Sequence, residues 1–347
     1  MQFPVTKQKF LEEYWQKKPL LMKEAVPNFQ TPLLPAELAE IAHNPAVEAR
    51  LISQYKDDWK VQYGPFSRSI LQRKGLWTLL VQQLDHIHPE VYELKKLVSF
   101  LPDWRFDGIM VSYAVTGARV GPHFDQYDVF LLQGMGCREW RLGPRCDENN
   151  PKIDHDELDL LAEIQIEAVY QVEPGDVVYV PPGVAHWGIA TSDCMTFSLG
   201  FRAPSIAELL ARRTDALLEQ LDNTALLEDR EAILRAGRSG EITPLHLQNI
   251  KDALTSVLDT FDDAKWFGEL VTESKYTDPL DPEHAIFKPS PNEEVRLAGD
   301  ARVVWLERSN GVDVFINGKH LISPKSTIGT LERLCSGQKL SLLRLKQ

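Results

Sequence analysis

The sequence predicts a mostly β core with flanking helices, a helical region after the core, and a small α+β module at the carboxyl end. Two runs of short apolar and β-branched segments, separated by Gly and Pro turns, predict the core. VSYAVTGARVGPHFDQYDVFLLQGMGCREWRLG begins at Val111, and EPGDVVYVPPGVAHWGIATSDCMTFSLGF ends at Phe201. Beyond about Pro204 the apolar spacing becomes that of amphipathic helices, so we expect the core to end there.

Helices and strands are expected before the core. A helix within residues 4–25 should end at Lys18-Pro19, with an extended segment after it. Residues 50–63 are strand-like up to the break at Gly64-Pro65, and the strand-rich core starts at Trp104. Further helices are expected around PAELAEIA in residues 31–44, over the apolar residues 76–84, and over the amphipathic residues 90–100. An acidic, less apolar insertion covers residues 147–167 and should form an exposed helix.

Two helix starts follow the core. Ser205 and Glu208 form a capping box, and Thr243-Pro244 places Pro at a first helical position. Their apolar faces are Ile206, Leu209, Leu210 and Leu217 in the first helix, and Ile250, Leu254, Val257, Leu258 and Phe261 in the second. These helices either cover the core or pair with a second copy of the chain.

The carboxyl end predicts a small module of winged-helix size. The proline-rich residues 277–292 should be a linker. Strands are expected over residues 295–306 and 312–322, the second interrupted by an Asn317-Gly318 turn. A short helix over 327–335 and an apolar tail over 340–345 should follow.

Composition bounds the class of protein. The chain has 347 residues, of which 43% are hydrophobic and 25% charged, as in a globular protein with two or three domains. We expect no membrane span, because no apolar run approaches about 18 residues, and no secretory signal. Four cysteines without CxxC spacing favour a reduced, cytoplasmic setting. The net charge of −12 counts against DNA binding and favours a basic partner.

His123, Asp125 and His186 are the candidate metal ligands. Residues two apart on a strand point the same way, so His123 and Asp125 share a face, and His186 on a distant strand completes the set. Two histidines and one carboxylate are the facial triad that binds Fe(II) and leaves positions open. The alternatives are two ordinary hydrogen-bonded histidines without a metal, or His155 as third ligand, although His155 lies in the acidic insertion.

Such an iron site needs a co-substrate, and 2-oxoglutarate is the common one. Its far carboxylate requires a buried cation. Arg138 shares a strand face with Trp140, whereas Arg141 shares one with Glu139 and is more easily solvated, so Arg138 is the candidate. Hydroxyl donors to the same co-substrate are expected from Ser112, Thr196 and Ser198, unless these side chains bond only local backbone.

At GPHFDQYDVFLLQGMGCREWRLG, PGDVVYVPPGVAHWG and SLGFRAP the chain resembles the Jumonji-C 2-oxoglutarate oxygenases. It is similar, more narrowly, to the bacterial ribosomal oxygenases that hydroxylate an arginine of the sixteenth large-subunit ribosomal protein. The resemblance implies a double-stranded β-helix (cupin or jelly-roll) core, with His123, Asp125 and His186 as iron ligands. By position, Arg138 and Ser112 match residues that hold 2-oxoglutarate. Ala114 departs from the pattern, since relatives can carry a second serine there.

The resemblance also implies a domain organisation and a homodimer. We expect an oxygenase domain over residues 1–203 with its core at about 92–203, a helical dimerisation region over 204–276, and a winged-helix-like domain over 277–347. The partner would be a ribosomal protein substrate, without membrane or direct DNA contact. Tyr127 is expected on the ligand face, with Gln126 and Asp128 off it, and Asp128 is as compatible with a structural ion pair as with substrate contact.

Three alternatives stay open. Within the enzyme class they are hydroxylation of a histidine in another ribosomal protein, and lysine demethylation. Outside it, a metal-binding cupin without turnover could act as an interaction protein through its carboxyl-terminal module, which is only mildly basic between Lys319 and Lys325.

Overall fold

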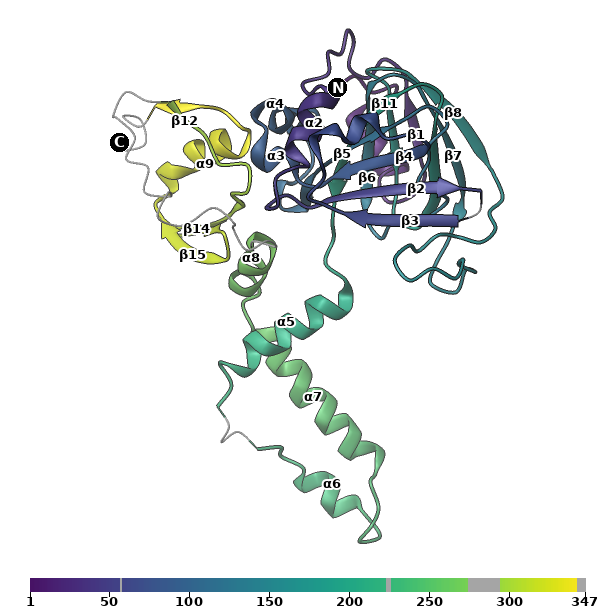
Figure 1. The fold of residues 1–347 in the computed structure, drawn as a ribbon. Helices are drawn as coiled ribbons and strands as arrows, with labels where there is room; N and C mark the ends of the chain where they lie inside the picture. Colours follow the sequence, from purple (N-terminus) through teal and green to yellow (C-terminus); the bar gives the residue numbers. More distant parts are fainter. Residues whose placement is uncertain (57, 223–225, 274–293, 342–347) are drawn as a thin grey trace. The chain divides into compact units, whose positions relative to one another are not determined.

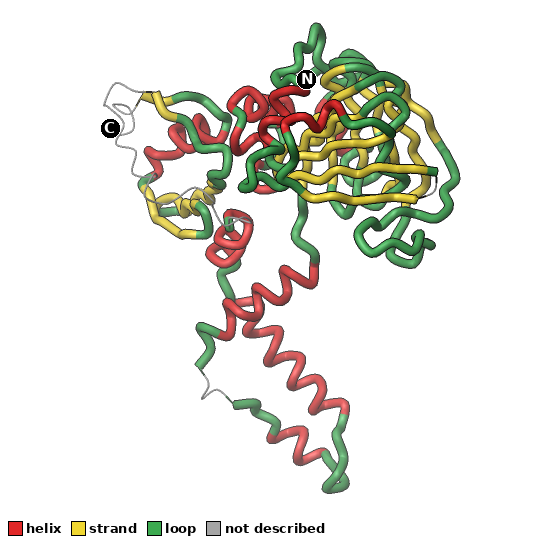
Figure 2. Tube along the Cα trace, viewed as in Figure 1, coloured by secondary structure: helices red, strands yellow, loops and turns green. Residues whose placement is uncertain are grey.

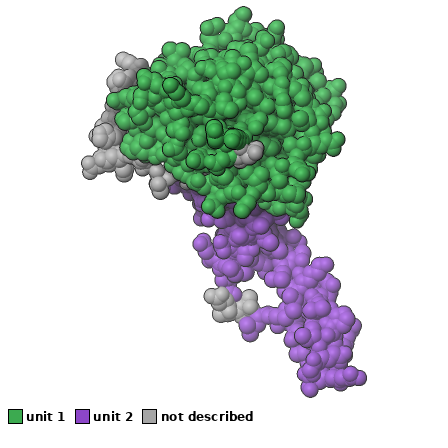
Figure 3. All heavy atoms as spheres, turned by 45° about the vertical axis from the view of Figure 1, so that its right-hand side comes forward, with its two compact units in different colours: residues 1–203, 274–302, 327–347 green, residues 204–273, 303–326 purple. Residues whose placement is uncertain are grey.

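The computed structural model describes residues 1–56, 58–222, 226–273 and 294–341. It divides into two compact units, one built around residues 1–203 and the other around residues 204–273 and 303–326 (Figure 3). Residues 294–302 and 327–341 belong to the first unit. The expected three-part division stays a prediction. In the described residues, no helix is long and apolar enough to cross a membrane.

The amino-terminal segment alternates short helices and strands. Its elements are α1 (Lys7–Glu13), β1 (Leu20–Met22), α2 (Pro35–Ile41), β2 (Ala49–Tyr55), β3 (Asp58–Tyr63), β4 (Leu76–Val81), α3 (Leu84–Ile87) and α4 (Pro89–Tyr92). The first helix is shorter than expected, because the backbone at Gln16 is left-handed and its N–H donates to the Tyr179 hydroxyl at 2.7 Å. The strand character expected over residues 50–63 is confirmed, although the segment forms two paired strands, β2 and β3.

Two helix predictions in this segment are wrong in kind or in length. Residues 76–81 form strand β4, which pairs with β2 and with β5 (Phe106–Ala114). The sheet buries both faces of β4, so its sequence is continuously apolar and lacks the alternation that separates a strand from a buried helix. The helix expected over 90–100 is only the single turn α4 followed by a 3₁₀ helix over Glu93–Val98.

The β core consists of two sheets. Its remaining strands are β6 (Asp128–Met135), β7 (Arg138–Arg145), β8 (Ala168–Val172), β9 (Val177–Val180), β10 (Val184–Ala190) and β11 (Cys194–Phe201). The larger sheet has the order β1-β9-β6-β11-β5-β4-β2-β3, and the smaller one has the order β10-β7-β8 (Figures 1 and 2). All pairings in these sheets are antiparallel, as expected for strands joined by short turns.

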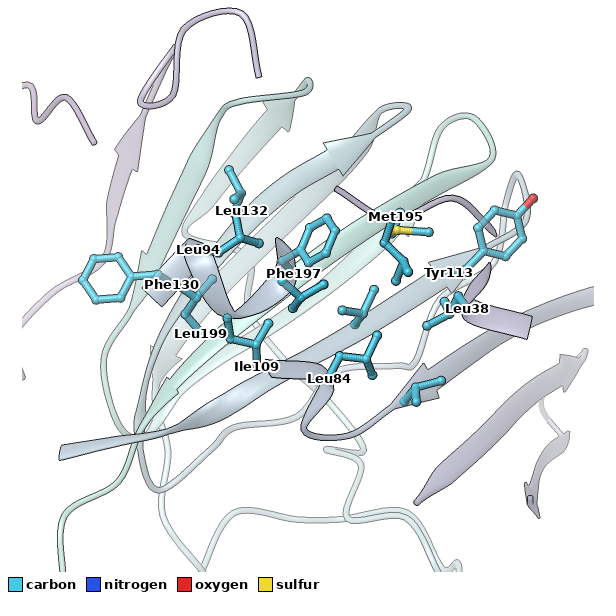
Figure 4. Packing of buried hydrophobic residues seen from close by; sticks show 14 of the residues in the cluster. Leu38, Leu84, Leu94, Ile109, Tyr113, Phe130, Leu132, Met195, Phe197 and Leu199 are labelled. Carbon is cyan, nitrogen blue, oxygen red and sulfur yellow. The ribbon is translucent and has the colours of Figure 1, made fainter. Parts of the chain in front are cut away.

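The larger sheet separates two interiors, because successive side chains point to opposite faces. Phe130 and Leu132 pack in the cluster that holds the amino-terminal helices through Phe10, Leu38, Leu84 and Leu94 (Figure 4). Their neighbours Val129 and Leu131 instead pack with Trp140 and Leu142 of β7. The smaller sheet therefore covers the other face of the larger one.

The acidic insertion contains no helix, contrary to expectation. Residues 147–167 form a loop closed by an isolated bridge between Lys152 and Leu161. Leu158 and Leu160 pack on Ile52 and Leu80 of the larger sheet. The expected exposure holds mainly for the charged and polar residues of the loop, since Leu158 and Leu160 anchor it to the core.

The second unit contains α5 (Ile206–Leu218), α6 (Arg230–Arg235), α7 (Pro244–Thr260) and α8 (Ala264–Thr272), with strands β13 (Val303–Arg308), β14 (Gly311–Ile316) and β15 (Lys319–Ser323). Ser205 caps α5 by accepting from the Glu208 N–H at 3.0 Å, and α7 starts at Pro244, as expected. Asn317 and Gly318 form the β14–β15 turn, both with positive φ.

The carboxyl-terminal elements of the first unit are β12 (Glu294–Val295), α9 (Ile328–Cys335) and β16 (Leu340–Ser341). The expected helix over 327–335 is thereby confirmed. The strand expected over 295–306 is present only at its two ends, as β12 and β13. The linker expected over residues 277–292 and the tail beyond Ser341 lie outside the described residues.

Candidate active site

A cavity of about 350 Å³ lies between the two sheets of the first unit. The larger sheet supplies inward-facing residues of β2, β4, β5, β6 and β11, and the smaller sheet supplies residues of β7 and β10. All seven residues singled out in the sequence line this cavity: His123, Asp125, His186, Arg138, Ser112, Thr196 and Ser198. The fold therefore brings together side chains that lie up to 86 positions apart, from Ser112 to Ser198.

Backbone hydrogen bonds bring the two histidines side by side. His123 and His186 form an isolated antiparallel bridge, with N–H to carbonyl distances of 3.1 and 2.8 Å. The carbonyl oxygen of Asp125 accepts from the Gly183 N–H at 2.7 Å, which fastens the segment after His123 to the turn before β10. Residues 123–125 are thus held by pairing, although they do not belong to a continuous strand.

The three side chains converge on one point. One ligand atom from each of His123, Asp125 and His186 lies within 4.8 Å of the others. Nδ1 of His123 lies 2.9 Å from the Gly121 carbonyl oxygen, and Nδ1 of His186 lies 3.0 Å from that of Val184. A ring N–H at Nδ1 donates in each case, so the Nε2 lone pairs stay free for a metal.

Electrostatics keep the deeper histidine neutral. Burial, followed by the neighbouring His123, lowers the pKa of His186 to about 4, while Asp125 opposes that change. The imidazole is therefore unprotonated at neutral pH, the form that binds a metal. A donor set of two imidazoles and one carboxylate fits Fe(II).

Tyr127 lies beside this set, whereas His155 and Asp128 have other roles. Burial, the charge of Asp125 and a hydrogen bond to that carboxylate raise the pKa of the Tyr127 phenol. His155 accepts the Glu157 N–H at Nδ1, and its Nε2 contacts the Trp59 carbonyl oxygen of β3, so both ring nitrogens are occupied away from the metal ligands. Asp128 is fully buried and accepts from the Tyr179 hydroxyl, which makes it a structural group.

Arg138 is buried without a hydrogen-bond partner. Its side chain is 4% exposed, and neither Nε nor Nη2 meets an acceptor among the described residues. Trp140, two residues along β7, has an unpartnered indole N–H in the same cavity. Gly188 makes room for the guanidinium stem, since a Cβ there would lie 2.6 Å from Arg138 Cδ. The rival Arg141 donates to Glu139 at 2.6 Å and does not line the cavity.

Buried donors of this kind fit an anionic ligand. A buried polar group without a partner is unfavourable, and a guanidinium pairs best with a carboxylate. The residues around Arg138 therefore fit the far carboxylate of 2-oxoglutarate.

The three hydroxyl residues lie on one face of the neighbouring strands β5 and β11. Ser112 on β5 is directly opposite Thr196 on β11, and Ser198 follows two residues later on the same face. Thr196 donates to the buried Gln133 side chain at 3.0 Å, which leaves its oxygen lone pairs as acceptors. Ala114 is fully buried against small side chains and does not line the cavity.

Arg50 of β2 and Glu157 of the insertion also line the cavity, and sequence reasoning missed both. The sequence around Arg50 could have indicated that this residue is functional. It lies between Ala49 and Leu51, so a charge interrupts the apolar first half of the strand. Glu157 had no such signal, because it is one of many acidic residues in the insertion.

Comparison with known proteins places this geometry in context. The JmjC domain family matches residues 93–209, and an AraC-like ligand binding domain matches residues 167–255. The chain is 35% identical over 326 residues to the ribosomal protein uL16 3-hydroxylase of Escherichia coli K12, covering 91% of this chain and 85% of that protein.

Solved structures agree along almost the whole chain. The X-ray structure of E. coli YcfD is 32% identical, with a TM-score of 0.83, and the match covers 98% of this chain and 91% of that one. A structure of YcfD, a ribosomal oxygenase, in complex with cobalt and 2-oxoglutarate is 31% identical, with a TM-score of 0.81 and the same coverage. The predicted fold class, a β-rich JmjC or cupin core with flanking helices, is confirmed.

Proposed function

The chain belongs to the JmjC-domain ribosomal oxygenases, and from that premise we propose that it is an Fe(II)- and 2-oxoglutarate-dependent protein hydroxylase acting on an arginine side chain of ribosomal protein uL16. The observation that carries this proposal is one cavity with two complementary parts. Three convergent ligand atoms lie at its centre, and the unpartnered guanidinium of Arg138 lies in its wall.

The metal and the co-substrate would be held by this chain's own groups. His123, Asp125 and His186 would ligate Fe(II) through Nε2, a carboxylate oxygen and Nε2. Bound Fe(II) and 2-oxoglutarate supply the oxidation, in which the co-substrate loses CO₂ to become succinate and one atom of O₂ enters a C–H bond.

Arg138 would bind the far carboxylate of 2-oxoglutarate, with Ser112, Thr196 and Ser198 as further hydrogen-bonding groups on the facing sheet.

The chain's contribution to the reaction is binding, orientation and exclusion of water. The carbonyl oxygens of Gly121 and Val184 fix the ring orientations of the two histidines. Leu158 and Leu160 close one side of the cavity with apolar surface. A carbon of the substrate side chain then reaches the metal in a dry, shaped site, which favours a single product.

The uL16 assignment rests on the similarity to the uL16 3-hydroxylase, and the arginine rests on the family resemblance at the sequence motifs, rather than on a contact in this chain. A histidine or methyl-lysine target would fit the same ligand set, and the similarity to the uL16 3-hydroxylase favours hydroxylation of uL16 over these alternatives. A basic ribosomal protein also suits a chain of net charge −12, and a cytoplasmic location follows from such a substrate.

We also propose a homodimer that is built by the helical region over residues 204–276, ahead of a winged-helix-like domain over 277–347. Support comes from apolar side chains that the second unit leaves exposed on α5 and α7. Ile206 is 80% exposed, Leu210 60% and Leu254 61%. Solvent-facing leucines and isoleucines at helical spacing mark an interaction surface. Analytical ultracentrifugation of the wild type and of Leu210→Glu/Leu254→Glu should show a dimer and a monomer, respectively.

The function is tested with purified protein, Fe(II), 2-oxoglutarate and uL16. We expect succinate release that uL16 stimulates, and a gain of one oxygen atom on an arginine of uL16. Histidine hydroxylation would appear as the same mass gain on another residue, and an inert metal-binding protein would release no succinate. His123→Ala should remove both signals while the protein stays folded.

A further inference from the structure

Arg50 stands on the same face of the larger sheet as the co-substrate residues. It is directly opposite Leu80 on β4, Leu80 is opposite Ser112 on β5, and Ser112 is opposite Thr196 on β11. Directly opposite residues of antiparallel strands point to the same side of the sheet. This row of four residues runs along one wall of the cavity, and Arg50 stands at its β2 end.

The guanidinium of Arg50 lacks an acceptor. Nε of Arg50 is buried and meets no hydrogen-bond partner among the described residues. Within them, Arg50 and Arg138 are the arginines with such a nitrogen. Arg105 and Arg119 show the usual arrangement, with bonds to Asp128 and Gln54. An unpartnered buried donor in a cavity indicates an acceptor that arrives with a ligand.

Under the proposed function, 2-oxoglutarate has no acceptor left for Arg50. The far carboxylate of that molecule would pair with Arg138, and its other end would bind the metal held by His123, Asp125 and His186. One strand, β4, separates Arg50 from Ser112, which corresponds to roughly 10 Å between their backbones. The acceptor for Arg50 must therefore come from the other molecule that enters this cavity, the polypeptide substrate.

We propose that Arg50 is a substrate-positioning residue whose guanidinium donates to a main-chain carbonyl oxygen of the polypeptide substrate. A main-chain carbonyl is the acceptor that every polypeptide brings with it. The positive charge of Arg50 also repels a cationic target side chain, which directs that side chain away from β2 and towards the metal ligands. Arg50 thus fixes the backbone of the substrate while the target side chain enters the cavity. The inference rests on the proposed function.

The test compares Arg50→Met with Arg119→Met. Arg119 is a matched control, because its Nε donates to Gln54 on the same strand β2 and it does not line the cavity. Each protein is loaded with Mn(II) and 2-oxoglutarate, which prevents turnover, and its dissociation constant for purified uL16 is measured by calorimetry. We expect about a tenfold to hundredfold weaker binding for Arg50→Met, as for a lost hydrogen bond to a charged group, and no change for Arg119→Met.

Two further readouts separate positioning from other roles. The affinity of Arg50→Met for 2-oxoglutarate should stay within about twofold of the wild type, and Arg119→Met should keep the wild-type succinate release in the absence of uL16. If that variant melts early, Arg50→Lys keeps the charge but loses the fork of donors and should show an intermediate loss.

Unchanged uL16 binding in Arg50→Met would overturn the inference, and so would a parallel loss of 2-oxoglutarate affinity. A wild-type protein that neither binds nor hydroxylates uL16 would instead overturn the proposed function. The two failures are therefore distinguishable.

Discussion

Two arginines of the first unit, Arg105 before β5 and Arg138 on β7, have opposite surroundings. Arg105 donates to Asp128 at 3.2 Å and to the Arg202 carbonyl at 2.9 Å. Asp128 accepts in addition from the Tyr179 hydroxyl at 2.5 Å, and it is fully buried. Arg138 is more deeply buried than Arg105, yet two of its nitrogens meet no acceptor within the described residues.

The difference separates a structural network from a binding site. Around Arg105 each buried charge has a partner within the protein. The network therefore stabilises the fold without a ligand. Around Arg138 the donors face a cavity, and under the proposed function a bound carboxylate would complete the set and offset the unfavourable burial. Hydrogen-bond satisfaction, rather than burial or charge, distinguishes the two regions.

The largest effect is expected at the metal ligands. His123→Ala removes one of three convergent ligand atoms, so succinate release should fall to background. The free energy of unfolding without metal should change by less than about 1 kcal/mol, because the His123 side chain makes one hydrogen bond, to Gly121. Activity assays together with urea unfolding check both parts. Residual turnover near the wild-type level would show that His123 is not a ligand.

Breaking the structural network should affect stability alone. Asp128→Ala leaves Arg105 buried without its carboxylate, which should lower the free energy of unfolding by about 3–5 kcal/mol. The affinity for 2-oxoglutarate should not change, since neither residue lines the cavity. Asp128→Asn, which retains an acceptor, serves as the milder control. A loss of co-substrate affinity at unchanged stability would reverse the roles assigned to the two regions.

Arg138→Met should weaken 2-oxoglutarate binding without lowering stability. The dissociation constant for 2-oxoglutarate should rise about tenfold to a hundredfold, as expected when a charged hydrogen bond is lost. Stability should stay the same or increase slightly, because an apolar side chain replaces an unpartnered buried cation. Calorimetric titration and thermal melting measure the two quantities. Arg141→Met, on the outer face of the same strand, should leave both unchanged.

The smallest effect is expected at Ala114, the position where relatives can carry a serine. Ala114 packs against Ala118, Ala190 and Cys194 rather than lining the cavity. Ala114→Ser should therefore cost about 1–2 kcal/mol of stability for the buried hydroxyl and bring no gain in 2-oxoglutarate affinity. A clear gain in affinity, measured by the same titration, would show that this position faces the co-substrate.

Parts of this arrangement were predictable from the sequence because short motifs carry them. GPHFD, the PPG turn before His186 and the Arg138–Trp140 spacing predicted residues that the fold brings to one cavity. Local rules also predicted the α5 cap at Ser205 and the Asn317-Gly318 turn. Strand β4 was misread as a helix, since burial on both faces removes the alternation that identifies a strand.

Other features depend on contacts between distant segments. The lack of partners around Arg138 and Arg50 becomes visible only when the surrounding strands are in place. The same holds for the insertion, whose Leu158 and Leu160 pack on β2 and β4. No local pattern could reveal these relations, because each involves segments that are well separated in the chain.

The most direct test of the central claim is the intact mass of uL16 after incubation with this protein, Fe(II) and 2-oxoglutarate. We predict a gain of one oxygen atom, located on an arginine by fragmentation, that disappears without 2-oxoglutarate or with His123→Ala. An unchanged mass of uL16, from a preparation in which the metal and 2-oxoglutarate are shown to bind, would contradict the claim.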